Sequence, residues 1–373
     1  MPPYLFARIE KTRDELKARG VDIVDLGVGD PDAPTIPKVV NAMHKAIDDP
    51  KNHNYPPYEG TAQFRGAVAD WYSRRFGVSL DPEKEVLSLI GSKEGIAHIC
   101  WAFIDPNDVA LIPDPCYPVY RVNTILAGGV PHAVPLLEKN KFIPDLGAID
   151  KKIAKRAKLL FINYPNNPTA AVCDKKFLED AVAFAKANDL LLASDLAYSE
   201  VAFDGYRPMS VLEIPGAKDV SIEFHSLSKT FNMTGWRIGM AVGNARAIAA
   251  LSVIKTNIDS GIFKAIQEAS IEALNTNSGP SKEVNAVYAK RRKILIDGLN
   301  CLGWDMEMTK ATFYVWGKVP KDYTSEKFCA EVLEKAAVLL VPGSGYGECG
   351  EGYFRASITV PDERIAACHR CSF

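Results

Sequence analysis

The chain has 373 residues, a formal net charge of -2, 47% hydrophobic residues and 24% charged residues. This length allows two or three domains of usual size, or two unequal lobes that share one site. The near-neutral charge and the lack of a basic patch argue against a nucleic-acid partner, and no apolar run approaches the roughly eighteen residues of a membrane span. The N-terminus lacks the long apolar region of a signal peptide, so we expect a cytoplasmic protein.

Eight cysteines are scattered through the chain, at positions 100, 116, 173, 301, 329, 349, 368 and 371. Only Cys368 and Cys371 have a paired spacing, in the segment C-H-R-C. That segment lacks the further ligands that a zinc or haem site requires. We therefore expect free thiols and no bound metal.

The N-terminal segment predicts an arm and an amphipathic helix, followed by a short strand. Leu5, Ile9 and Leu16 give the helical spacing, and Tyr4 lies on the arm. Residues 21–32, V-D-I-V-D-L-G-V-G-D-P-D, alternate apolar and acidic side chains and then turn through glycines. Such a turn allows the backbone to approach a ligand closely.

A strand, a glycine turn and a helix are predicted over residues 86–99, V-L-S-L-I-G-S-K-E-G-I-A-H-I. The start of a helix presents unpaired N–H groups and a partial positive charge, so Gly91, Ser92 and Lys93 form a candidate anion site. An apolar strand at 109–112 then leads to Tyr117, whose ring can stack on a planar ligand. Before these elements, a turn-rich segment at 53–60 precedes a helix that carries Phe64, Val68 and Trp71.

The middle of the chain alternates apolar strands and amphipathic helices. Residues 158–169 and 190–198 predict strands, and about 175–188 predict the helix between them. This rhythm indicates a buried parallel sheet built from βαβ units, and ligands bind at the polar ends of such strands. Asn167 is expected to end one strand, and Asp195 and Tyr198 another.

The remaining segments complete an α/β fold with a mostly parallel sheet, helices on both faces, and a smaller α+β lobe. After a further strand at 238–243, I-G-M-A-V-G, residues 254–263 predict a loop, and helices follow at about 264–274 and 281–302. The N-terminal strand is expected to join the small lobe. We predict a large cofactor-binding domain at 45–265, and a small domain made of 1–44 and 266–373.

Lys229 lies in the segment E-F-H-S-L-S-K-T-F-N-M-T-G-W-R-I-G and is the candidate carrier of an aldehyde cofactor. A lysine that forms a Schiff base must be neutral, and burial among apolar side chains lowers its pKa. Ser226, Ser228 and Arg237 lie close in sequence, so two hydroxyls and a guanidinium can grip one phosphate.

The motifs together resemble fold-type I pyridoxal-phosphate aminotransferases of class I and II. They keep the family order, from G-V-G-D-P-D through N-N-P-T, D-L-A-Y and S-L-S-K to F-R-A-S. The resemblance implies that Lys229 binds pyridoxal 5'-phosphate and later moves a proton. It further implies that Asp195 pairs with the ring nitrogen, that Tyr198 and Asn167 bond the phenolic oxygen, and that Tyr117 stacks on the ring.

The resemblance also assigns the phosphate and implies a homodimer with shared active sites. Tyr55 matches the tyrosine that reaches across to the phosphate of the neighbouring subunit. The phosphate-binding residues of this chain are expected to be Ser92, Lys93, Ser226, Ser228 and Arg237.

Longer segments, including P-P-Y-L-F-A-R-I, N-Y-P-P-Y-E-G and N-I-D-S-G-I-F, look like those of bacterial LL-diaminopimelate aminotransferases. Those enzymes reversibly convert LL-diaminopimelate and 2-oxoglutarate into tetrahydrodipicolinate and glutamate, in lysine and cell-wall synthesis. Arg355 would then hold the α-carboxylate and Gly29 would contact it through the backbone. The far end of the substrate requires further charge-matched groups. The candidates for the remaining substrate contacts are Tyr4, Lys93, Tyr117, Asn167 and, from the partner subunit, Glu59 and Asn257.

Other activities remain open on the same scaffold. An aminotransferase with an aspartate, alanine or aromatic donor, or a β-lyase, would keep the cofactor residues and change the substrate side. A regulator of this fold requires a DNA-binding domain in front, and a degenerate enzyme would be expected to lose Lys229, Asp195, Arg237 or Arg355. The sequence departs from the family pattern at Ala170, at Leu196 and at its short C-terminal end.

Overall fold

The computed structural model describes residues 7–276 and 281–367. The predictions for Tyr4 and for the segment from Cys368 to Cys371 lie outside these residues. Within them, no helix is long and apolar enough to cross a membrane.

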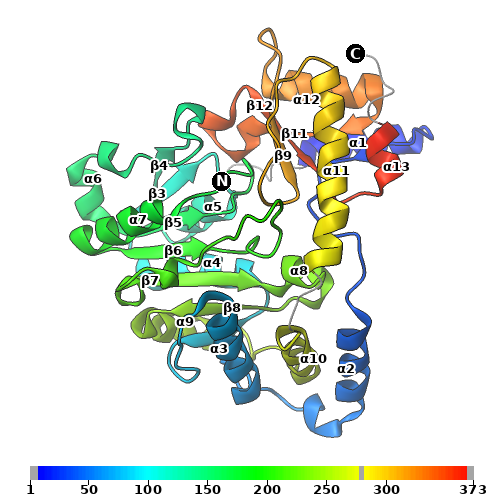
Figure 1. Ribbon diagram of the computed structural model, residues 1–373. Helices are drawn as coiled ribbons and strands as arrows, with labels where there is room; N and C mark the ends of the chain where they lie inside the picture. Colours follow the sequence, from blue (N-terminus) through cyan, green and yellow to red (C-terminus); the bar gives the residue numbers. More distant parts are fainter. Residues whose placement is uncertain (1–6, 277–280, 368–373) are drawn as a thin grey trace.

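A seven-stranded sheet forms the centre of the larger part of the molecule (Figure 1). The strand order is β2-β8-β7-β6-β5-β3-β4, and β8 is the strand that runs antiparallel to both of its neighbours. All other neighbouring pairs are parallel, which confirms the predicted class of sheet. The strands are β2 (Val86–Leu89), β3 (Val109–Asp114), β4 (Val130–Pro135), β5 (Ala157–Asn163), β6 (Leu191–Asp195), β7 (Ser221–Ser226) and β8 (Gly239–Gly243).

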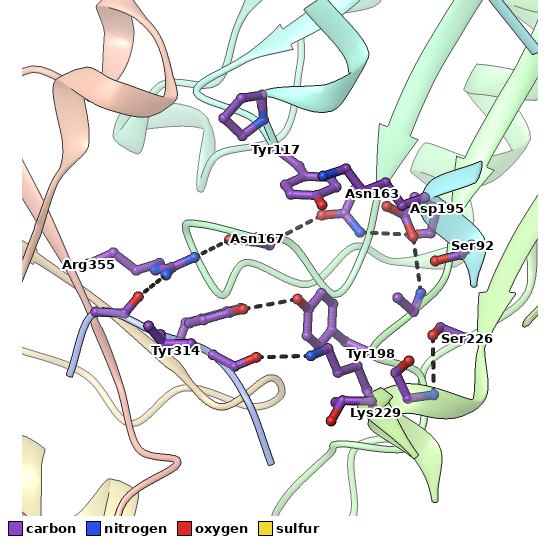
Figure 2. Close-up of a pocket in the computed structure, with 18 of the residues that line it drawn as sticks. Ser92, Tyr117, Asn163, Asn167, Asp195, Tyr198, Ser226, Lys229, Tyr314 and Arg355 are labelled. Atoms are coloured by element: carbon purple, nitrogen blue, oxygen red, sulfur yellow. Dashed lines mark hydrogen bonds between the residues drawn. The ribbon is translucent and has the colours of Figure 1, made fainter. Parts of the chain in front are cut away.

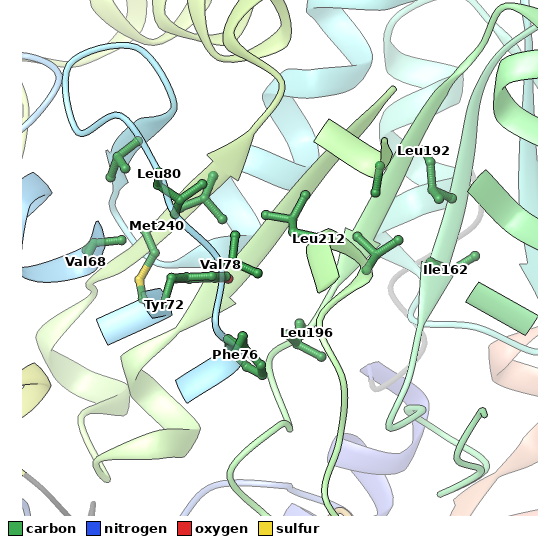
Figure 3. Close-up of a cluster of buried hydrophobic side chains, with 14 of the residues drawn as sticks. Val68, Tyr72, Phe76, Val78, Leu80, Ile162, Leu192, Leu196, Leu212 and Met240 are labelled. Atoms are coloured by element: carbon green, nitrogen blue, oxygen red, sulfur yellow. The ribbon is translucent and has the colours of Figure 1, made fainter. Parts of the chain in front are cut away.

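Helices cover both faces of this sheet, as expected for strands that are apolar on both sides. Two apolar clusters pack between the sheet and these helices, one on each face. One contains Val68 and Tyr72 (Figure 3), and the other contains Ile99 and Leu251. The helices around the sheet are α3 (Ala62–Phe76), α4 (Ser92–Phe103), α5 (Val119–Leu126), α6 (Lys151–Arg156), α7 (Lys175–Asn188), α8 (Leu227–Thr230) and α9 (Ala245–Ile258).

Local capping chemistry explains where several of these helices begin. The side chain of Thr61 accepts a hydrogen bond from the Phe64 N–H at the start of α3, and Asp174 does the same for Phe177 at the start of α7. α4 begins differently, because Gly91 precedes it and provides no side-chain cap. The N–H of Glu94 bonds the Gly91 carbonyl at 3.2 Å, so the N–H groups of Ser92 and Lys93 are the ones left to a ligand or to solvent.

The smaller lobe contains two short sheets and several helices. β1 (Val24–Asp25) pairs in parallel with β10 (Val338–Leu339), so the N-terminal strand joins this lobe as predicted. β12 (Tyr353–Ser357) lies between β11 (Val341–Pro342) and β9 (Tyr314–Lys318). The helices of this part of the chain are α1 (Ala7–Ala18), α11 (Ser281–Cys301), α12 (Ser325–Ala336) and α13 (Asp362–Ala367).

α2 (Pro37–Asp48) and α10 (Lys264–Leu274) pack against each other at the lower end of the view in Figure 1. Val39 from α2 and Ala273 from α10 belong to the same apolar cluster as the side chains beneath the large sheet. The division of the chain at residues 45 and 265 stays a prediction.

Two sequence predictions require correction. Residues 254–263 were expected to form a loop, but α9 continues to Ile258, and Lys255 near its end is held by two partly buried carboxylates. Two strands end earlier than expected: β5 ends at Asn163 and not at Asn167, because the chain turns through Tyr164 and Pro165, and β6 ends at Asp195, so that Tyr198 lies in the turn that follows. Both differences arise from long-range or turn contacts that a local pattern does not contain.

Candidate active site

A cavity of about 450 Å³ lies where the ends of β5, β6 and β7 face the small lobe (Figure 2). Carboxyl ends of parallel strands are the usual ligand edge of an α/β sheet. Residues from distant parts of the chain line this cavity, from Arg13 on α1 to Arg355 on β12. The cavity therefore depends on the closure of the small lobe over the large sheet.

Lys229 enters the cavity from α8, the single helical turn that follows β7. Its Nζ donates to the carbonyl oxygen of Gly29 at 2.9 Å. Burial lowers the pKa of Lys229 to about 8; Asp30 opposes this shift, and the guanidinium groups of Arg237 and Arg355 reinforce it. An amine with this pKa is neutral in a useful fraction of molecules near neutral pH, as a nucleophile or base must be.

Asp195 ends β6 and lies at the floor of the same cavity, with 6% of its surface exposed. Its Oδ2 accepts from the Tyr120 hydroxyl at 2.7 Å, and its Oδ1 accepts from the Ala197 N–H at 3.3 Å. Burial raises the pKa of Asp195 to about 6, although the Tyr120 bond acts in the opposite direction. A buried carboxylate in this setting favours a cationic partner.

Arg355 connects β12 to the loop after β5. Its Nη1 donates to Asn167 Oδ1 at 2.9 Å, and its Nη2 donates to the Gly27 carbonyl at 2.6 Å. The Nε of Arg355 is buried and has no hydrogen-bond partner among the described residues. Asn167 is itself held by Asn163, whose Oδ1 accepts from the Asn167 N–H at 2.8 Å. The guanidinium is thus fixed in the cavity wall.

The opposite end of the cavity is suited to an anion. Gly91 has a φ of +75°, and a Cβ at this position would lie 2.3 Å from Arg237 Nη2, so only glycine allows the guanidinium to approach the start of α4. Ser92, Ser226 and Ser228 line the same end. The Ser228 hydroxyl is buried and has no partner among the described residues. Helix N–H groups, hydroxyls and a guanidinium are typical phosphate ligands.

The structure brings most of the predicted residues together in this cavity. Twelve of them line it: Gly29, Ser92, Lys93, Tyr117, Asn167, Asp195, Tyr198, Ser226, Ser228, Lys229, Arg237 and Arg355. In Figure 2, Tyr117 lies across the cluster from Lys229. Their individual roles stay predictions.

Three predicted residues lie away from the cavity of their own chain. Tyr55 is 86% exposed on the loop before α3. Glu59 lines a separate open groove, and Asn257 is exposed on α9, where its Nδ2 donates to the Val253 carbonyl at 2.8 Å. These residues were expected to act from a partner subunit.

Sequence reasoning missed several residues of the cavity. Asn163 could have been found, because it is the polar residue that directly ends the apolar run of β5. Tyr120 on α5 bonds Asp195 without lining the cavity itself, and nothing in the local sequence connects the two residues. Tyr314 and Tyr346 reach the cavity from the small lobe, and the local sequence contains no signal for that.

Comparisons with known proteins agree with this geometry. The family model described as aminotransferase class I and II matches residues 21–369. Substrate-bound BacF from Bacillus subtilis superposes with a TM-score of 0.95 at 36% identity, over 99% of this chain and 94% of that chain. A Thermus thermophilus aspartate aminotransferase mutant has a TM-score of 0.93 at 29% identity, over 99% and 96%.

Curated relatives are more similar in sequence. The LL-diaminopimelate aminotransferase of Gloeobacter violaceus is 55% identical over 98% of this chain and 94% of its own length. That of Moorella thermoacetica is 56% identical over the same two shares. The matched family model covers nearly the whole chain, including all three sheets of the described residues and every residue that lines the cavity except Arg13. The chain therefore belongs to the class I and II aminotransferase family.

Proposed function

We propose that this protein is an aminotransferase that moves an amino group reversibly from LL-2,6-diaminopimelate to 2-oxoglutarate, giving tetrahydrodipicolinate and glutamate, with pyridoxal 5'-phosphate as cofactor. The observation that carries the proposal is the meeting of Lys229, Asp195 and Arg355 in one cavity beside an anion-binding end. Relatives at 53–56% identity that bear the name LL-diaminopimelate aminotransferase support the choice of donor.

The residues of the cavity fit this cofactor. The buried carboxylate of Asp195 suits the protonated ring nitrogen, and the start of α4 with Ser228 and Arg237 suits the phosphate. Lys229 would hold the aldehyde carbon through its amine, which burial keeps partly neutral. Pyridoxal phosphate, when bound, supplies the electron withdrawal that acidifies the α-carbon of an amino acid.

The side chains of this protein would then orient the substrate and move protons. Arg355, held by Asn167 and Gly27, would bind the α-carboxylate. Lys229 Nζ would take the proton from the substrate α-carbon and deliver it to the aldehyde carbon of the cofactor, and it would move a proton in the opposite direction when the 2-oxo acid is converted. Its present bond to the Gly29 carbonyl keeps the amine beside the segment that contacts the substrate.

A homodimer with shared active sites is part of the proposal. Segments 53–58 and 258–263 lie side by side: a Cβ placed at Gly261 would lie 3.0 Å from atoms of Pro56 and Pro57. They expose Tyr55 and, with exposed fractions of 45%, 50% and 37%, the side chains of Tyr58, Ile258 and Phe263. An exposed apolar patch of this kind indicates a protein interface. In this dimer Tyr55 would contact the phosphate in the partner subunit, and Glu59 and Asn257 would bind the far end of the substrate.

A cytoplasmic location also belongs to the proposal. The cysteines among the described residues, at positions 100, 116, 173, 301, 329 and 349, are all free. Free thiols are typical of a reducing compartment.

The direct test presents the purified, cofactor-loaded protein with LL-diaminopimelate, meso-diaminopimelate, aspartate, alanine and aromatic amino acids, one at a time. LL-diaminopimelate should convert the visible spectrum to that of the amine form, and addition of 2-oxoglutarate should restore it with formation of glutamate. If only aspartate, alanine or an aromatic amino acid does so, the proposed donor is wrong. Formation of pyruvate without a 2-oxo acid would indicate a β-lyase.

A further inference from the structure

Tyr198 and Tyr314 bring their hydroxyl oxygens to 3.0 Å from each other in the wall of the cavity (Figure 2). Both side chains are buried, with 6% and 3% of their surface exposed. Tyr198 follows the end of β6 in the large sheet, whereas Tyr314 begins β9 in the small lobe. The hydroxyl pair therefore joins the two parts of the molecule at the active site.

Three contacts fix the position of Tyr314. Its N–H donates to Thr312 Oγ1 at 3.1 Å, and Thr312 has a φ of +65°, which is rare for a β-branched residue. A Cβ at Gly29 would lie 2.1 Å from the Tyr314 hydroxyl oxygen, so the loop that contains Gly29 packs directly on this hydroxyl. The ring centre lies 4.2 Å from the Arg355 guanidinium carbon. Backbone strain of this kind is kept where surrounding structure requires it.

The direction of the hydrogen bond decides what Tyr198 can do. Each phenol has a single proton to donate. If Tyr198 donates to Tyr314, its proton is used within the wall. If Tyr314 donates, Tyr198 keeps its proton for an acceptor in the cavity and becomes a stronger donor through cooperativity. The Arg355 cation on the Tyr314 ring withdraws electron density from that ring, and so favours Tyr314 as the donor.

We propose that Tyr314 is a positioning residue, whose hydroxyl donates to the oxygen of Tyr198 and thereby directs the Tyr198 proton into the cavity. The inference rests on the proposed function, because the acceptor of that proton is the phenolic oxygen of pyridoxal phosphate. The same Tyr314 ring supports Arg355, so one side chain aligns the carboxylate-binding group and the phenol that faces the cofactor.

The test uses Tyr314→Phe, which removes the hydroxyl and keeps the ring on Arg355. The visible absorption of the cofactor-loaded protein is titrated with pH in the absence of substrate. In this variant Tyr198 still donates to the cofactor oxygen but loses the cooperative strengthening from Tyr314, so the negative charge on that oxygen is less stabilised. The titration midpoint should therefore rise, by less than the about 0.7 pH unit expected for the loss of a whole hydrogen bond. The KM for 2-oxoglutarate should change by less than about twofold, because the ring contact with Arg355 remains.

Tyr288→Phe is the matched control. Tyr288 is 1% exposed, belongs to the same apolar cluster as Tyr314, and has its ring centre 5.7 Å from that of Phe313. The variant therefore loses an equally buried hydroxyl. Its titration midpoint should equal that of the wild type. A double-mutant cycle adds specificity: in a Tyr198→Phe background, Tyr314→Phe should cause no further shift.

The outcomes separate the two proposals. A wild-type protein that gains no visible absorption with pyridoxal phosphate overturns the proposed function, and this inference with it. A normal wild-type titration with an unshifted Tyr314→Phe midpoint overturns the positioning role alone. An equal shift in Tyr288→Phe, or a full further shift in the Tyr198→Phe background, also contradicts it.

Discussion

At the scale of single residues, burial sets the pKa values of the two ionisable groups that line the cavity, Lys229 and Asp195. Lys229 loses hydration and its pKa falls to about 8, while the same loss raises the pKa of Asp195 to about 6. A carboxyl and an amine whose pKa values move toward neutrality in one cavity are characteristic of catalytic sites.

The lowered pKa of Lys229 predicts how the cofactor-free protein captures its cofactor. Only the neutral amine attacks an aldehyde, so the second-order rate of pyridoxal phosphate binding should rise with pH and level off above a midpoint near 8. Stopped-flow absorbance measures this rate, and Lys229→Ala should show no covalent spectrum at any pH. A midpoint near 10.5 would mean that the lysine is not desolvated.

The raised pKa of Asp195 predicts a pH-dependent stability of the cofactor-free protein. Because the folded pKa, about 6, exceeds the unfolded value, protonation stabilises the fold at low pH, and this contribution is lost as pH rises through 6. Asp195→Asn should therefore become more stable relative to wild type between about pH 4 and 7, by about 2 to 3 kcal/mol. Urea unfolding at several pH values tests this, and a constant difference would contradict it.

At the scale of elements, the end of α9 braces the start of α4. The Nζ of Lys255 is fully buried and donates to Glu94 Oε1 at 3.0 Å and to both oxygens of Asp259 at 2.8 and 2.9 Å. Glu94 in turn accepts from the Ile90 N–H, next to the glycine that opens the phosphate end of the cavity. This cluster also explains why helix continues where the sequence predicted a loop.

Lys255→Met should disturb both stability and cofactor binding. Removal of the shared ammonium leaves two partly buried carboxylates unpaired, so the free energy of unfolding should fall by about 3 to 5 kcal/mol. The apparent affinity for pyridoxal phosphate should fall as well, because Ile90 and the start of α4 lose their brace. Chemical denaturation and equilibrium dialysis measure the two effects.

Lys38→Met is the control for this prediction. Lys38 pairs with Glu272 between α2 and α10, but its side chain is 65% exposed, so the loss should be below about 1 kcal/mol. Equal losses in the two variants would mean that burial of Lys255 is not decisive.

At the scale of the whole molecule, the proposed dimer predicts complementation between two inactive variants. Lys229→Ala and Tyr55→Ala should each have little activity alone. The two variants are mixed by unfolding and refolding. In a mixed dimer, one site takes Lys229 from the Tyr55→Ala subunit and Tyr55 from the Lys229→Ala subunit, and this site should be active. Random mixing gives about one quarter of wild-type activity, because half of the dimers are mixed and half of their sites are intact.

The result would differ if Tyr55 served its own chain. Then every site of a mixed dimer would contain one defect, and mixing would restore nothing. Sedimentation of the wild-type protein supplies the independent check, since a monomer at assay concentration contradicts the shared site.

The sequence alone determined the class of sheet, the alternation of strands and helices in the middle of the chain, and twelve residues of the cavity. It could do so because the strands are apolar runs with polar ends, and because Lys229, Asp195 and Arg237 lie in short segments whose residue types are tied to one chemistry. Periodicity and capping signals are local, so they survive in the sequence.

Only the tertiary structure decided which groups tune these residues. Tyr120 meets Asp195 from 75 residues away, Tyr314 meets Tyr198 from 116, and Arg355 meets Asn167 from 188. The desolvation that moves the pKa values of Lys229 and Asp195 likewise depends on the closure of one lobe over the other. These effects arise from through-space contacts and from exclusion of water, and neither has a signature in the local order of residues.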